Sequence, residues 1–145
     1  MPVPVSDDTP SPLLLLLPLL SRFLTPPAHL FARLTKTQLL IVTALSYHES
    51  FHMSQLASYL SFSKEQATRA AAPLVEAGLV ERFAQSENRT RVFLRLTAEG
   101  KTLADELRAQ FSSHLKARVS TSLSESEQLE LREAAETLVR LLSKI

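Results

Sequence analysis

The chain has 145 residues, of which 45% are hydrophobic and 21% are charged, and its formal net charge is +1. These values are typical of one globular domain, and they exclude a disordered tail, a collagen-like fibre and a multi-domain enzyme. Only two glycines are present, which excludes glycine-rich phosphate-binding loops, and the abundance of Ala, Leu, Glu, Lys and Arg predicts a mostly helical fold. The absence of cysteine excludes disulfides, thiolate zinc sites, a cysteine nucleophile and thiol-based redox sensing.

The first 34 residues are proline- and leucine-rich. Four prolines in residues 1–12 predict a flexible arm, and residues 13–34 predict one or two short apolar helices, because Pro18 and the pair Pro26-Pro27 interrupt the leucine run. Residues 13–34 would give a small protein a large apolar surface. Such a surface favours association, and a second copy of the chain is the simplest partner. The run is too short to span a membrane, and no basic residue precedes it as in a signal peptide. We therefore expect a cytoplasmic protein with no membrane partner.

Capping boxes mark the next helices. Thr35 and Gln38 open one that contains the apolar run Leu39–Leu45, and a short helix is expected from Ser54 to Leu60. Ser63 and Gln66 form a second box, whose helix should end with Gly78 at the C′ position. Pro73 lies inside that helix, removes a backbone donor, and predicts a kink or an early end near Ala72.

The remaining chain predicts a hairpin and two more helices. Alternation of apolar and polar residues over Leu79–Phe83 and Arg91–Leu96 is typical of two strands, joined by the polar stretch Gln85–Thr90. Thr97 should cap a long amphipathic helix. A third box, Ser124 with Glu127, opens the last helix. The last helix carries an apolar stripe that we expect to pack in the core, made of Leu131, Ala134, Ala135, Leu138, Leu141, Leu142 and Ile145.

The order of these elements is that of a winged helix-turn-helix, in which the second helix of a pair enters the major groove and a hairpin tip reaches the neighbouring minor groove. From Arg82 to Arg95 the chain is basic, with Arg82, Arg89, Arg91 and Arg95 against the single acid Glu87. Three segments carry a family resemblance: Met53 to Ala57, Leu79 to Arg82, and Leu96 to Gly100. With them the chain resembles the MarR family of bacterial transcription regulators over about residues 12–145.

The resemblance implies roles for individual residues. Ser63 to Gly78 would be the recognition helix, with Gln66 able to pair with adenine and Arg69 with guanine. Gln66 could instead serve only its capping box, and Arg69 could bind phosphate or nothing. Arg89 stands at the family's wing arginine, which inserts into the minor groove. The expected DNA-binding residues are Ser63, Lys64, Gln66, Thr68, Arg69, Arg89 and Arg91.

Two departures from the family pattern affect the expected DNA affinity. The family usually carries acidic residues where this chain has Gln85 and Asn88, and one of them braces the wing arginine. Asn88 can accept a hydrogen bond but carries no charge, so the brace should be weaker. Pro73 inside the recognition helix is the second departure.

A competing motif is His48-Glu49-Ser50-Phe51-His52, which matches the H-E-x-x-H pattern of zinc proteases. The motif lies between a helix and a turn, and Gln55 and Ser58 occupy the places where the extended zinc motif has glycine and histidine. Two alternatives remain for this motif. His48 or His52 could bind a regulatory metal, or both could be ordinary loop histidines with no ligand. We expect no enzyme, no catalytic residues, no metal and no cofactor.

The sequence thus predicts a mainly α fold with a small β-hairpin wing. Residues 35–100 would form the winged helix-turn-helix, and residues 13–34 and 101–145 would form dimerisation helices. The expected function is a homodimeric, sequence-specific regulator of transcription that binds double-stranded DNA at a pseudo-palindrome. The resemblance implies a repressor relieved by a small aromatic or anionic effector, for which His29 is a candidate contact. The alternative is a winged-helix module that binds protein instead of DNA.

Overall fold

The structure is a computed structural model that describes residues 11–29, 33–85 and 87–145, apart from the side chains of residues 88–90. Nearly all of the predicted N-terminal arm lies outside these residues. The chain divides into two compact units, each described separately below. One unit contains Met1–Pro26 and Ser113–Ile145, and the other contains Pro27–Ser112.

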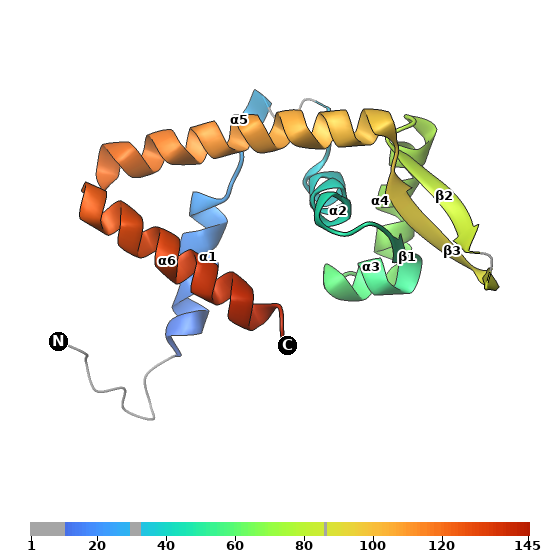
Figure 1. Cartoon of the computed structure of the whole chain (residues 1–145), viewed down its shortest axis with the longest axis horizontal. Coiled ribbons are helices and arrows are strands. Elements are labelled where there is room, and N and C mark those ends of the chain that lie inside the picture. Colours follow the sequence, from blue (N-terminus) through green and yellow to red (C-terminus); the bar gives the residue numbers. More distant parts are fainter. Residues whose placement is uncertain (1–10, 30–32, 86) are drawn as a thin grey trace. The chain divides into compact units, whose positions relative to one another are not determined.

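The elements follow the predicted order (Figure 1). The helices are α1 (Pro12–Phe23), α2 (Lys36–Tyr47), α3 (Met53–Tyr59), α4 (Lys64–Glu76), α5 (Ala98–Ser122) and α6 (Glu125–Leu142), and the strands are β1 (Phe51–His52), β2 (Val80–Gln85) and β3 (Asn88–Leu96). The mainly helical fold with a small β-hairpin is confirmed. All three predicted capping boxes are present, and Gly78 follows α4 with the positive φ of 73° expected at C′.

The sheet is larger than the sequence predicted. Its order is β1-β3-β2, with every pair antiparallel, and the two-residue strand β1 was not predicted. Both hairpin strands extend further toward the tip than expected, with an irregularity in register between Ala84 and Gln85. Val80, Leu94 and Leu96 lie on the buried face, whereas Phe83 and Phe93 pair across the strands on the outer face. The sheet therefore presents one face to the core and one outward.

The core belongs to the unit that contains Pro27–Ser112. Helices α2, α3 and α4, the sheet and the start of α5 bury one cluster, whose largest fully buried side chains are Ile41, Leu56, Leu74, Leu94, Val42 and Val80. Burial of each such side chain stabilises the fold by roughly 1.5–3 kcal/mol. Leu56 on α3 and Leu74 on α4 lie in this same cluster, so the packing of the core fixes α3 and α4 together.

Pro73 does not end α4. The expected early end near Ala72 is wrong, since the helix continues to Glu76 and the carbonyl oxygen of Pro73 accepts the N–H of Ala77. Pro73 itself is exposed, while Ala71 and Leu74 beside it are buried. Core packing of the last turn therefore holds the helix through the residue that lacks a donor.

Replacing this proline should stabilise the protein. Pro73→Ala restores one helical N–H donor with little loss of packing. An interior proline costs roughly 3 kcal/mol, and about 1 kcal/mol of that is offset because proline also restricts the unfolded chain. The expected gain in free energy of unfolding is about 2 kcal/mol, measured by urea denaturation. Ser63→Ala, which removes a cap from the same helix, should instead lose about 1 kcal/mol. A Pro73→Ala variant no more stable than the wild type would contradict this account of α4.

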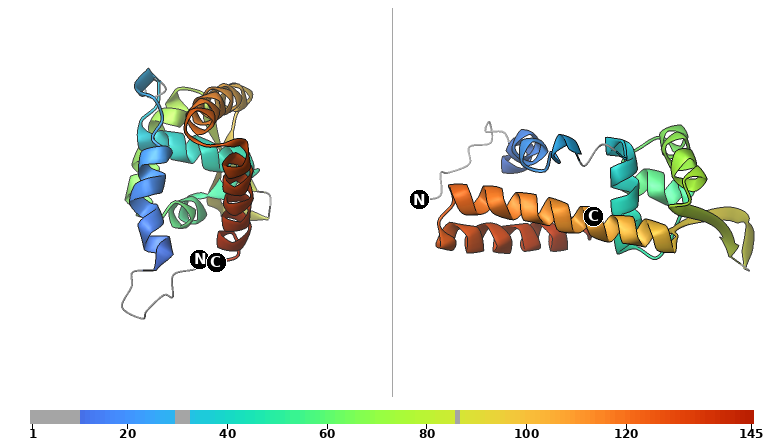
Figure 2. Two further views of the ribbon diagram at one scale, coloured as in Figure 1. Left: turned by 90° about the vertical axis from the view of Figure 1, so that its left-hand side faces the viewer. Right: turned by 90° about the horizontal axis from the view of Figure 1, so that it is seen from above.

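The other unit consists of α1, the second half of α5, and α6, with the chain reversing direction between α5 and α6 (Figure 2). Pro18 was expected to interrupt α1, but it lies inside one continuous helix that ends before Pro26 and Pro27. The surrounding leucines are strong helix formers, and Pro18 and Leu14, whose carbonyl loses its helical donor, are both exposed. The guanidinium of Arg118 on α5 donates to the carbonyl oxygens of Arg22 and Phe23, at 3.4 and 3.1 Å, and lies 5.5 Å from the Phe23 ring.

The apolar stripe of α6 is not core within this chain. Neither α1 nor α6 has a buried residue, and on α6 Leu131, Leu141 and Leu142 are 41–55% exposed. The prediction that this stripe packs in the chain's own core is wrong, because among the described residues of this unit only Pro26 is buried, and the stripe has no buried apolar side chains to pack against. Among the described helices, none combines the length and apolar character needed to cross a bilayer.

Candidate nucleic-acid interface

Helix α4 has one buried and one exposed face. Ala67, Ala71 and Leu74 are 0–1% exposed and pack into the core. The opposite face of the first two turns is open and carries the predicted residues Ser63, Lys64, Gln66, Thr68 and Arg69. An α-helix fixed on its apolar side, with short polar and cationic side chains on the other, can enter a major groove about 12 Å wide.

Local hydrogen bonds already engage three of these residues. The Ser63 hydroxyl accepts the N–H of Gln66, and the Gln66 Oε1 accepts the N–H of Ser63 at 2.9 Å. Thr68 donates its hydroxyl to the Lys64 carbonyl at 2.8 Å. Gln66 therefore serves its capping box in this structure, and pairing with adenine through both amide atoms would require that bond to open. Lys64 and Arg69 remain exposed cations.

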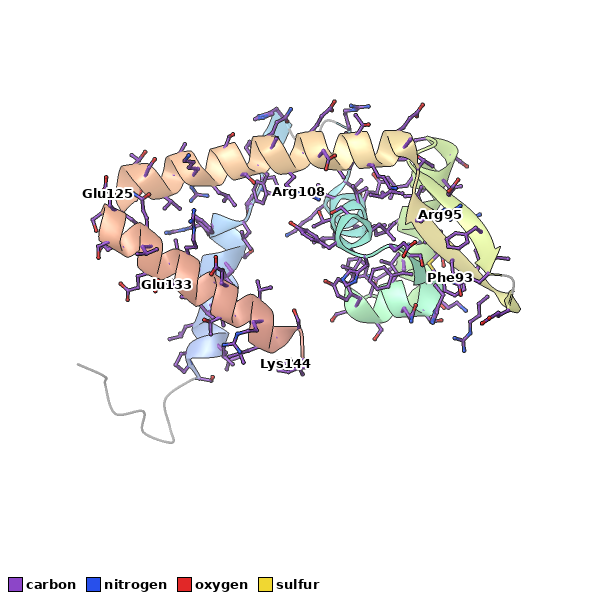
Figure 3. The ribbon with its side chains drawn as sticks, viewed as in Figure 1. Phe93, Arg95, Arg108, Glu125, Glu133 and Lys144 are labelled. Carbon is purple, nitrogen blue, oxygen red and sulfur yellow. The ribbon has the colours of Figure 1, made fainter. Side chains whose placement is uncertain are left out.

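The wing places its arginines in different surroundings. Arg95, which is labelled in Figure 3, donates through Nε to Glu81 at 2.5 Å. Its guanidinium lies 4.2 Å from the centroid of the Phe83 ring. Both partners of this ion pair are nearly half exposed, so it contributes at most about 1 kcal/mol and mainly fixes the orientation of Arg95. Arg91 is exposed on the same face of β3, and no ion pair engages it among the described side chains. Arg89 lies on β3 near the hairpin tip, and the structure does not describe its side chain.

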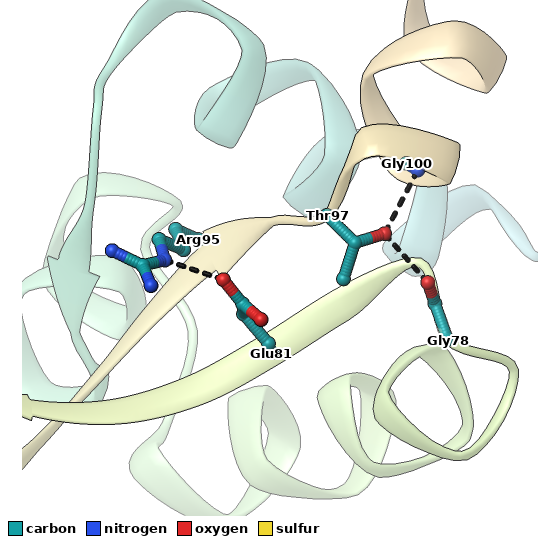
Figure 4. A network of polar contacts seen from close by, with 5 residues as sticks. All are labelled: Gly78, Glu81, Arg95, Thr97 and Gly100. Atoms are coloured by element: carbon teal, nitrogen blue, oxygen red, sulfur yellow. Dashed lines mark hydrogen bonds and ion pairs between the residues drawn. The ribbon is translucent and has the colours of Figure 1, made fainter.

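Thr97 joins the end of α4 to the start of α5 (Figure 4). Its hydroxyl donates to the Gly78 carbonyl at 2.5 Å and accepts the N–H of Gly100 at 3.1 Å. Its own N–H donates to the Leu79 carbonyl at 3.0 Å. These three bonds confirm Thr97 as the cap of α5 and hold the hairpin, the end of α4 and the start of α5 together.

The H-E-x-x-H segment is not a helix. Helix α2 ends at Tyr47, His48 is its C-cap, and His52 ends strand β1, so the two histidines cannot share one helix face. The His48 ring packs against Phe51 and Tyr59, at centroid distances of 4.8 and 5.0 Å. The described residues contain no group of three His, Asp or Glu side chains arranged to hold a metal ion. The geometry that a zinc protease needs is therefore absent from this segment.

Comparisons with known proteins agree with the winged helix. The MarR family model matches residues 34–92. The solved structure of NadR in complex with 4-hydroxyphenylacetate is 25% identical, with a TM-score of 0.73 over 94% of this chain and 97% of that one. No match is found among curated proteins.

Two further solved structures share the fold of this chain. Wild-type MarR from E. coli in its apo form is 18% identical, with a TM-score of 0.75 over 92% of this chain and 98% of that one. A mutant MarR from E. coli complexed with operator DNA is 20% identical, with a TM-score of 0.65 over 88% and 94% of the two chains. The chain therefore has the fold of MarR-family transcriptional regulators.

One feature of the winged helix was not predicted from the sequence. His52 is the N-cap of α3, with Nδ1 accepting the N–H of Gln55 and the Gln55 side chain accepting the N–H of His52, both at 3.2 Å. The glutamine three residues after the cap is the same signal that revealed the boxes at Thr35 and Ser63. The sequence did not predict this cap, because histidine is not among the usual N-cap residues.

Proposed function

We propose that the chain is a homodimeric transcriptional regulator that binds double-stranded operator DNA in a sequence-specific manner. The observation that carries this proposal is the exposed polar face of α4, anchored on its buried side and followed by a basic hairpin within a MarR-family domain. Lys64 and Arg69 on α4 and Arg89 and Arg91 on β3 supply the cations for phosphate and base contacts. The similarity in fold to a MarR mutant complexed with operator DNA supports the same function.

The dimer would form through the exposed apolar residues of α1 and α6. Leu13, Leu14, Leu15, Leu17 and Leu19 of α1 are each more than half exposed. A contiguous apolar surface of this kind favours association, and a second copy of the chain presents the same surface. Two DNA-binding lobes would then meet half-sites about one helical turn apart on a pseudo-palindrome.

The proposed regulation is repression relieved by a small aromatic anion. Support comes from NadR, whose structure contains 4-hydroxyphenylacetate and which covers nearly all of this chain. An aromatic carboxylate is also the effector class that the resemblance implied.

Fluorescence anisotropy on duplex DNA from upstream of the protein's own gene tests the proposal. Arg89→Ala should weaken binding about tenfold, equivalent to about 1.4 kcal/mol, because the arginine would lose its place in the minor groove. Arg69→Ala should weaken binding to a similar degree. Binding should also fall steeply as salt rises, since phosphate contacts release counterions. Adding 4-hydroxyphenylacetate to the complex should release the DNA.

The matched control is Arg132→Ala, which removes an exposed arginine from α6, outside the DNA-binding lobe. Its affinity should equal that of the wild type. A folded dimer that binds no duplex at low salt would contradict DNA binding and favour a protein-binding winged helix.

A further inference from the structure

Thr97 is the single residue between the hairpin and α5. Strand β3 ends at Leu96, and α5 begins at Ala98. On the other side of the hairpin, residues 77–79 separate the end of α4 from the start of β2. The two connections meet, because Val80 pairs with Leu96 at the base of the hairpin. The direction in which the wing leaves the lobe is therefore set by these few residues.

The turn that follows α4 is bonded to that helix. The N–H of Gly78 donates to the carbonyl of Val75 at 3.0 Å. The N–H of Leu79 donates to the carbonyl of Leu74 at the same distance, and Leu74 is 1% exposed in the core. The carbonyl groups of Gly78 and Leu79, which both accept bonds from Thr97, are therefore fixed to the last turn of α4.

The Thr97 hydroxyl differs from the other capping hydroxyls of the lobe. At Thr35 and Ser63, the hydroxyl accepts the N–H three residues later, and a glutamine at that position accepts the N–H of the cap. At Thr97 the third residue is Gly100, which has no side chain. The Thr97 hydroxyl accepts the N–H of Gly100 and donates its own proton to the carbonyl of Gly78 (Figure 4). One side chain thus joins the end of α4 to the first turn of α5.

The first turn of α5 also lies directly against the turn after α4. A Cβ atom at Gly100 would lie 1.9 Å from the carbonyl oxygen of Leu79, so the absence of a side chain permits this approach. The N–H of Thr97 donates to the same oxygen. Removal of the Thr97 hydroxyl would leave this backbone bond and the close approach in place. The junction would therefore loosen without unfolding.

We propose that Thr97 is a positioning residue for operator binding, whose hydroxyl holds the wing at the angle to α4 that simultaneous binding in two grooves requires. This inference rests on the proposed function. A duplex presents its major and minor grooves at a fixed spacing, so α4 and the hairpin tip bind together only if the angle between them is held. Phosphate contacts made by individual cations do not require this angle. Loss of the hydroxyl should therefore weaken binding to the operator more than binding to an arbitrary duplex.

The test compares Thr97→Val, which keeps the side-chain shape and removes the hydroxyl, with Thr97→Ser, which keeps the hydroxyl. Anisotropy with the upstream duplex should show about tenfold weaker binding for Thr97→Val, the loss expected when the wing arginine leaves the minor groove. Thr97→Ser should bind within about twofold of the wild type. Neither variant should change the affinity for a duplex of scrambled sequence by more than about twofold.

The matched control is Thr35→Val, which removes the capping hydroxyl of α2 in the same unit. Thr35→Val and Thr97→Val should each lower the folding equilibrium constant about five-fold in urea unfolding, which is the usual worth of one N-cap. Only Thr97→Val should weaken operator binding. The comparison separates a loss of positioning from a loss of stability.

Equal operator affinities for Thr97→Val and Thr35→Val would overturn the inference, as would an equal loss of affinity by Thr97→Val for the operator and the scrambled duplex. A wild-type chain that binds both duplexes equally, or neither, would overturn the operator part together with the proposed function. In that case, hydrogen exchange of the Gly100 amide still decides whether the hydroxyl holds the junction. This amide should be protected in the wild type and in Thr97→Ser, and it should exchange faster in Thr97→Val.

Discussion

Gly100→Ala should destabilise the winged helix by about 3 kcal/mol, measured as the free energy of urea unfolding. A Cβ atom at Gly100 would lie 1.9 Å from the carbonyl oxygen of Leu79 and 2.9 Å from its carbonyl carbon. Neither is a flexible side chain that can rotate away. The same carbonyl oxygen accepts the N–H of Thr97, so any shift that relieves the clash breaks the junction between wing and α5. Overpacking of this kind typically costs about 1–3 kcal/mol, and here backbone must move as well.

Gly78→Ala is the matched control for that substitution. Gly78 has a φ of 73°, but a Cβ there would meet nothing closer than a Glu99 side-chain oxygen at 3.7 Å. Its cost is therefore only that of the left-handed conformation, about 1–2 kcal/mol. A Gly100→Ala variant as stable as Gly78→Ala would contradict the close approach of α5 to Leu79.

Leu17→Glu and Val139→Glu should each convert the proposed dimer to monomer at micromolar concentration. Each side chain is 67% exposed in the single chain, one on α1 and one on α6. If both are buried between copies, each substitution removes two apolar side chains worth roughly 1.5–3 kcal/mol apiece. The dissociation constant should therefore rise at least about 100-fold. Analytical ultracentrifugation should give twice the 16.1 kDa chain mass for the wild type and the chain mass itself for the variants.

Glu133→Gln is the control for the dimer, because it changes an exposed polar residue of α6 without adding charge to the apolar surface. It should sediment as the wild type does. A wild-type chain that is monomeric at all concentrations would refute the dimer, and dimeric glutamate variants would place the interface elsewhere.

Features governed by local chemistry were predictable. The capping boxes at Thr35, Ser63 and Ser124 each depend on two side chains three residues apart, so the sequence contains the whole interaction. The position of Gly78 after α4 is also set locally, because the residue that follows a helix often adopts a positive φ, which glycine allows. For the candidate site, this was enough to locate the start of helix α4 and its exposed polar residues.

Features governed by distant partners were not predictable in the same way. Strand β1 has two residues and no alternation of its own, and it exists because Phe51 and His52 pair with β3 much later in the chain. Helix α4 continues through Pro73 because Leu74 and Ala71 are held in the core. The pairing of Arg95 with Glu81 likewise follows from strand register.

The sequence by itself determined the order of elements, the ends of most helices and the basic hairpin, because these depend on periodicity and on caps a few residues long. Only the tertiary structure decided which apolar stripes are buried. The leucines of α1 and the stripe of α6 have the pattern of a core, yet they lie exposed in the single chain because burial depends on what packs opposite. The bond from Thr97 to Gly78 was decided in the same way, since it joins two segments that lie on either side of the hairpin.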